Sequence, residues 1–187
     1  MNAVKHLTLF CVFCLLSGMM MFHALPAVAD DLPPPYPDLL AEAEELNTLM
    51  TIMPVRIFNL GNRFAEAPDQ ELTARLADTV LTRADGKRGF TRRVGFTALR
   101  FIGRKDFTGV NLEAVVLRGM DDPVDWVRYD AVWAGEAAGL DTPAFRKKLA
   151  ELARGLDPSE YDAVSSSDPT GQMRKRAGLL LRKLKKS

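Results

Sequence analysis

The chain has 187 residues, of which 47% are hydrophobic and 26% are charged, and its 25 Lys and Arg nearly balance its 24 Asp and Glu. This length suffices for one domain with its own hydrophobic core. The near-zero net charge argues against nucleic acid as a partner, because nucleic-acid-binding domains are usually basic.

Residues 1–29 have the pattern of a secretory signal peptide. Lys5 precedes an apolar run over residues 7–22, and small residues lead to Ala29, directly before Asp30. We expect cleavage after Ala29 and export to the periplasm or the medium; the alternative is an uncleaved anchor. Every cysteine and histidine lies in this segment: Cys11, Cys14, His6 and His23. The mature chain would therefore lack disulfides, the usual zinc ligands and the Ser-His-Asp and Cys-His catalytic sets, so we expect no catalytic residue, cofactor or metal.

The next segments predict a linker and a pair of N-terminal capping helices. Four of the eight residues of 30–37 are proline, which favours an extended polyproline linker and places the folded domain at 38–187. Apolar residues at helical spacing, with acidic residues between them, predict an amphipathic helix over residues 38–53 that ends at Pro54. A short second helix should follow over residues 57–64.

Three pairs of helices are predicted after residue 69. In each pair, a stripe of apolar residues precedes a turn and a second helix; the three second helices cover residues 91–103, 123–139 and 170–186. Asp122-Pro123 and Asp168-Pro169 should begin two of them, since Asp caps the first turn and Pro suits the first helical position. No sustained two-residue alternation occurs, so the predicted fold is all-α. Residues 157–168, rich in serine, are predicted to form an irregular loop. The loop is either a recognition element or an insertion that the fold tolerates.

The three second helices are weak copies of one another, spaced by 36 and then 46 residues. Arg92, Arg128 and Arg174 share one column, and a small residue follows three positions later in each copy. The string DDPVDWVRYDAVWAGEAAG closely resembles the second-helix signature of HEAT repeats, in particular the short HEAT-like repeats first associated with bilin lyases. The resemblance implies a short right-handed solenoid of antiparallel helix pairs that binds other proteins.

In this family the column arginine pairs with an aspartate of a neighbouring turn. The resemblance therefore implies structural ion pairs between the three arginines and four turn aspartates: Asp85, Asp121, Asp122 and Asp168. The alternative is a row of arginines that binds anions. The same alignment places Glu136 between Arg100 and Arg182, which predicts a strip of alternating charge across the second helices.

Both tryptophans of the chain lie on one predicted helix. Trp126, Tyr129 and Trp133 recur at spacings of three and four, so they form one stripe, which either packs in the interior or binds a partner. Arg93 and Lys175 occupy equivalent positions in the adjacent copies. This mixture of aromatic and basic residues favours a protein-binding groove.

We therefore expect an exported protein-binding module or scaffold. One alternative is a peripheral envelope protein whose basic C-terminal helix lies on an anionic membrane surface, although that helix would also serve as a terminal cap. A third is a hydrolase that uses Asp121, Asp122 and Asp125, but acidic residues at a helix start are already explained by capping.

Overall fold

The computed structural model describes residues 31–48, 54–85 and 89–186. The predicted signal segment lies outside the described residues, as do the last five residues of the helix predicted over 38–53 and the three residues after Asp85. The chain divides into two compact units, residues 1–40 and 41–187. Among the helices described, none is both long and apolar enough to span a bilayer.

The described chain is mostly helical, which confirms the all-α prediction. The α-helices are α3 (Tyr36–Thr48), α4 (Pro54–Ala65), α5 (Gln70–Thr79), α6 (Phe90–Ile102), α7 (Leu112–Met120), α8 (Asp125–Ala137), α9 (Pro143–Leu152) and α10 (Pro169–Leu184). Two short 3-10 helices, η1 (Leu81–Arg83) and η2 (Pro158–Ala163), accompany them. The sequence did not predict the hairpin of β1 (Asp106–Phe107) and β2 (Val110–Asn111), because strands of two residues are too short to show alternation.

The predicted extended linker ends earlier than expected. Helix α3 begins at Tyr36, inside the proposed linker of residues 30–37, and the Tyr36 side chain is buried. Pro37 is tolerated there because the N–H groups of a first helical turn have no partner within the helix, so proline removes no bond. The proline content therefore did not exclude a helix at this point.

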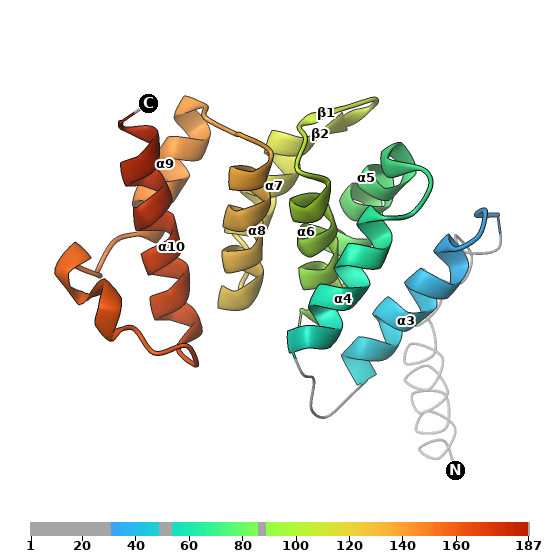
Figure 1. Cartoon of the computed structure of the whole chain (residues 1–187), viewed down its shortest axis with the longest axis horizontal. Coiled ribbons are helices and arrows are strands. Elements are labelled where there is room, and N and C mark those ends of the chain that lie inside the picture. The colour runs from blue at the N-terminus through green and yellow to red at the C-terminus, as the bar shows by residue number, and fades with distance from the viewer. Residues whose placement is uncertain (1–30, 49–53, 86–88, 187) are drawn as a thin grey trace, which may run out of the picture. The chain divides into compact units, whose positions relative to one another are not determined.

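Within residues 41–187, the second helices of the predicted pairs lie next to one another. Helix α6 packs against α4 and α8, and α8 packs in turn against α10, so these four helices stand side by side (Figure 1). Each predicted pair is also in contact: α5 with α6, α7 with α8, and α9 with α10. The exposed surfaces of successive second helices therefore adjoin one another.

Side-chain caps fix several helix starts. Asp69 accepts from the Leu72 N–H at 2.9 Å, and Asn111 accepts from Ala114 at 3.0 Å. Asp168 accepts from Gly171, with proline in the first turn, as predicted for α10. The same prediction was wrong for α8, which begins at Asp125 and not at Pro123.

The physical reason for the late start of α8 is that the Asp122 carboxylate is used elsewhere. It accepts from the Val124 N–H at 2.8 Å and pairs with Arg92, thirty residues earlier in the chain. A local capping rule cannot anticipate a partner so far away in the sequence.

The largest group of buried side chains lies between the paired helices. It includes Phe96 of α6, Val115 and Val116 of α7, Val127 of α8 and Phe145 of α9. Two glycines allow the aromatic rings to pack closely: a Cβ at Gly119 would collide with the Phe96 ring, and one at Gly135 would lie 2.7 Å from the Phe145 ring. The core thus depends on large rings packed against positions without side chains.

Residues 157–168 are more ordered than an irregular loop. Asp157 and Glu160 form a capping box that begins η2, and Tyr161 within it is 6% exposed. A Cβ at Gly178 of α10 would collide with the Tyr161 hydroxyl, so the ring lies directly against that helix. The buried tyrosine holds the segment to α10, and the prediction of an irregular loop was wrong for its first half.

Candidate functional site

The aromatic stripe of α8 is a feature separate from the core. Trp126 and Tyr129 contact edge to face at 5.4 Å between ring centroids, and Tyr129 and Trp133 do so at 6.3 Å. All three are partly exposed, whereas Val127 and Ala131 on the adjoining side of α8 are fully buried. Of the two interpretations of this stripe, the observed exposure favours a surface over interior packing.

Arg93 joins the stripe from the neighbouring helix α6. Its guanidinium lies 5.3 Å from the centroid of the Trp126 ring, and its Nε donates to Asp130 Oδ2 at 2.6 Å. Asp130 is 7% exposed, and this burial raises the pKa of its carboxyl group, although the charge of Arg93 acts in the opposite direction. Arg93 thus has two roles, stacking on the tryptophan and neutralising a buried carboxylate.

Two guanidinium groups from different helices lie against the Trp133 ring. Arg100 of α6 is 4.0 Å from the ring centroid and Arg176 of α10 is 3.0 Å from it. The indole N–H of Trp133 is buried, with no hydrogen-bond acceptor among the described residues. Ring contacts with Arg100, Arg176 and Tyr129 therefore hold this side chain, with no hydrogen bond from the indole N–H to a described residue.

The positively charged side chains near Trp133 differ in whether they have an ion-pair partner. Arg176 forms an ion pair with Glu136, and Lys183 approaches the same carboxylate at 3.1 Å. Arg100 has no ion-pair partner within the described part of the chain. Burial, followed by the positive charge of Arg100, lowers the pKa of Arg176 to about 10, while Tyr129 acts in the opposite sense. Two of the three cations therefore pair with Glu136, and the third, Arg100, contacts aromatic rings only.

The surface continues onto α4 through a second aromatic pair. Phe58 is 45% exposed and contacts Phe101 edge to face at 4.7 Å, and Arg100 lies 5.9 Å from each ring. Arg100 is therefore the residue that links the two aromatic groups. We call the whole set the arginine–aromatic strip: Phe58, Arg93, Arg100, Phe101, Trp126, Tyr129, Trp133 and Arg176.

Sequence analysis found only part of this strip. Trp126, Tyr129, Trp133 and Arg93 do lie together, but Lys175 is used elsewhere: its Nζ donates to the Tyr161 carbonyl at 2.7 Å and so anchors η2. Phe58 was missed. Its position outside the apolar stripe of Ile57, Leu60 and Phe64 could have indicated an exposed aromatic residue.

The predicted strip of alternating charge was wrong in its pairing. Glu136 bonds Arg176 and Lys183, not Arg100 or Arg182, and the Arg182 guanidinium lies 4.8 Å from the centroid of the Tyr161 ring. The alignment identified equivalent positions on the helices. Which side chains meet also depends on how far each helix is shifted along its axis relative to its neighbour.

The three column arginines have different surroundings. Arg92 donates twice to the carboxylate of Asp122, at 2.6 and 3.1 Å, which is a pairing of the kind the resemblance implies. Arg128 instead pairs with Asp125 on its own helix and donates to the Asp122 backbone carbonyl at 2.6 Å. Arg174 forms no ion pair with any described residue.

The remaining turn aspartates are also engaged differently from the expectation. Asp121 pairs with Lys148 of α9, and Asp168 caps α10. Asp85 is exposed and forms no ion pair with another described residue. A continuous ladder of Arg–Asp pairs is therefore not what these residues form.

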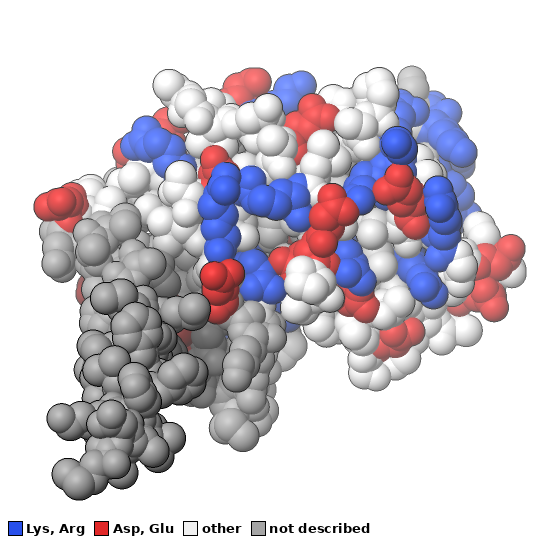
Figure 2. Space-filling model, turned by 180° about the vertical axis from the view of Figure 1, so that it is seen from behind, with Lys and Arg blue, Asp and Glu red and all other residues white. Residues whose placement is uncertain are grey.

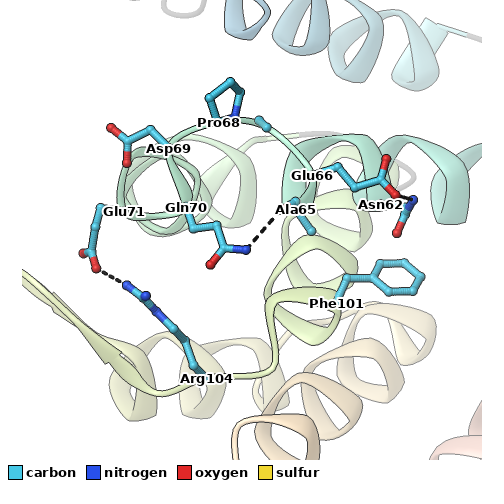
Figure 3. Close-up of a pocket in the computed structure, with 10 residues that line it drawn as sticks. Asn62, Ala65, Glu66, Pro68, Asp69, Gln70, Glu71, Phe101 and Arg104 are labelled. Atoms are coloured by element: carbon cyan, nitrogen blue, oxygen red, sulfur yellow. Dashed lines mark hydrogen bonds and ion pairs between the residues drawn. The ribbon is translucent and has the colours of Figure 1, made fainter.

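A hollow lies at the turn between α4 and α5. It has a volume of about 750 Å³, and most of its polar lining side chains bond to other lining residues (Figure 3). Glu71 pairs with Arg104 and accepts from the Thr108 N–H at 2.8 Å, while Asn62 donates to Glu66 at 2.6 Å. A polar ligand would have to replace these bonds, so this hollow is a weaker candidate than the strip.

Away from the strip, opposite charges largely neutralise one another. Figure 2 shows Lys and Arg interleaved with Asp and Glu across the face it presents. The helices α5, α7 and α9 carry such pairs, including Arg118 with Asp78 at 2.8 Å and Lys148 with Glu151 at 3.3 Å. The excess of cations around Trp133 therefore differs from this interleaved pattern.

Comparison of the chain with protein-family models, with curated proteins and with solved structures found no match.

Proposed function

We propose that this protein is an exported binding module that captures an acidic segment of another protein on its arginine–aromatic strip. The proposal includes its architecture: a short right-handed solenoid of antiparallel, HEAT-like helix pairs. Three observations support the repeat architecture: the recurrence of the second-helix pattern, the contact within each pair, and the contact between successive second helices. The export part depends on the signal pattern of residues 1–29.

The observation that carries the binding proposal is the arrangement around Trp133. Two guanidinium groups lie on one indole ring, and of the two only Arg176 has a carboxylate partner among the described residues. Like charges at this spacing repel one another, so a carboxylate brought by a partner would gain two nearby cations. Trp, Tyr and Arg also dominate the binding energy of protein interfaces. Acidic side chains interspersed with apolar ones would match this surface.

A membrane surface fits the structure less well. Ala177 and Leu180, on the apolar side of α10, belong to the core, so that side is already covered by protein. A helix that lies in a membrane interface needs its apolar side free. The basic residues of α10 are also partly engaged, since Arg176 and Lys183 bind Glu136.

A hydrolase has the least support. Asp121, Asp122 and Asp125 were its candidate carboxylates, and each forms an ion pair with a different cation: Lys148, Arg92 and Arg128. A paired-carboxylate mechanism needs one protonated and one ionised group facing the same substrate bond. Three carboxylates held apart by separate cations do not provide that arrangement.

Charge reversal at Arg100 tests the binding proposal. Arg100→Glu should weaken binding of a poly-glutamate peptide by at least about tenfold, because it replaces a cation that has no ion-pair partner among the described residues with an anion. Isothermal titration calorimetry at low salt gives the dissociation constants. The matched control is Arg75→Glu on α5, an exposed residue with the same change in net charge.

The two variants separate a site from a general charge effect. The control should bind the peptide nearly as well as the unmodified protein, and both variants should keep their helicity by circular dichroism. Equal weakening in both variants would mean that the peptide responds only to net charge, which would contradict a site on the strip.

A further inference from the structure

A second hollow lies among α8, α9 and α10. Its volume is about 340 Å³, and Met120, Leu152 and Met173 form the apolar part of its lining. The remaining lining residues are charged: Asp121, Arg128, Lys148, Glu151, Arg154 and Arg174. It shares no residue with the arginine–aromatic strip and does not depend on the function proposed for that strip.

The charges within this hollow do not balance. Lys148 forms ion pairs with both acidic residues of the lining, Asp121 and Glu151. Arg128 is held from outside the lining, by Asp125 and the carbonyl of Asp122. Neither of the other two arginines has an ion-pair partner in residues 31–48, 54–85 or 89–186. Two guanidinium groups therefore line one hollow without a counter-charge.

The end of α9 brings these two arginines together. The chain leaves the helix through Gly155, which has φ of +80°, directly after Arg154. A Cβ built at Gly155 would lie 3.6 Å from the guanidinium carbon of Arg174, so Arg174 lies against the backbone next to Arg154. Arg154 at the end of α9 and Arg174 of α10 thus line one hollow.

We propose that this hollow binds one oxyanion, a phosphate or a carboxylate group, between Arg154 and Arg174. Planar guanidinium groups bond oxyanions through two parallel N–H donors, and such charge-assisted bonds are stronger than neutral ones. The Lys148 ammonium, already neutralised by two carboxylates, adds little net charge. The apolar lining accommodates the carbon atoms that carry the oxyanion.

Amide NMR titration of the full mature chain tests this site. Sodium phosphate is added at constant ionic strength against sodium chloride, and the amides of Gly155 and Gln172 report on the two sides of the hollow. Their shifts should saturate, and Arg174→Gln should raise the dissociation constant by about tenfold or more. Arg154→Gln, at an exposed position, should raise it several-fold with helicity unchanged.

A parallel titration with sodium acetate distinguishes the two chemical classes, because the tighter of the two anions identifies the natural group. The control is Lys147→Gln, an exposed residue of α9 outside the hollow, which should leave the dissociation constant unchanged. Absence of saturation with both anions, or equal weakening by Lys147→Gln, would overturn the proposed oxyanion site. Neither result would affect the strip, because the strip is tested with a different ligand and other variants.

Discussion

Replacing Arg92 with alanine should lower the free energy of unfolding by about 3–5 kcal/mol, one of the two largest effects expected for this protein. The side chains of Arg92 and Asp122 are only 10% and 8% exposed, and the pair is bidentate. Arg92 also donates to the Ala84 carbonyl at 2.9 Å. Its removal leaves a buried carboxylate without its cation, which costs more than the bond itself contributes. Denaturant melts monitored by circular dichroism give the change in midpoint.

Two further variants make this result specific. Arg146→Ala removes a bidentate pair with Asp141 that is exposed to solvent, and its midpoint should not change measurably. Arg92→Met combined with Asp122→Leu removes both charges and should recover much of the stability lost in Arg92→Ala. A single Arg92→Ala variant as stable as the unmodified protein would show that the Arg92–Asp122 pair is not formed.

Phe145→Ala should cost about 3–5 kcal/mol as well, because it opens a cavity in the largest buried group. The Phe145 ring is fully buried and fills the space left by Gly135 of α8, near Val116 of α7. Phe58→Ala is the matched control: the same substitution at a ring that is 45% exposed should cost far less. Equal melting of the two variants would mean that α9 does not pack on α7 and α8 in this way.

The sequence predicted those parts of the fold that depend on local patterns. Helical spacing identified the helices, and the Asp168-Pro169 cap was placed correctly because its acceptor and donor lie three residues apart. The start of α8 was misplaced because Asp122 is engaged by Arg92, across two helices. The order in residues 157–168 comes from Tyr161 packing on Gly178, a contact that a serine-rich composition conceals.

For the candidate site, too, the sequence predicted the features that depend on local patterns but not those that depend on contacts between helices. Spacings of three and four residues put Trp126, Tyr129 and Trp133 on one side of their helix, and the structure places them together. Stacking of Arg100 and Arg176 on Trp133 was not predictable, because it depends on how far each helix is shifted along its neighbour. Lys175 was equivalent in the alignment, yet it bonds to η2 instead.

The central claim, that the arginine–aromatic strip binds an acidic partner, is tested most directly by tryptophan fluorescence. The chain has two tryptophans, and both belong to the strip, so emission excited selectively at tryptophan reports on this surface. Titration with a poly-glutamate peptide should change the emission in a saturable way, and added salt should weaken the effect. The change should be smaller in Arg100→Glu. Calorimetric binding of the peptide without any change in tryptophan emission would place the binding surface elsewhere and contradict the proposal.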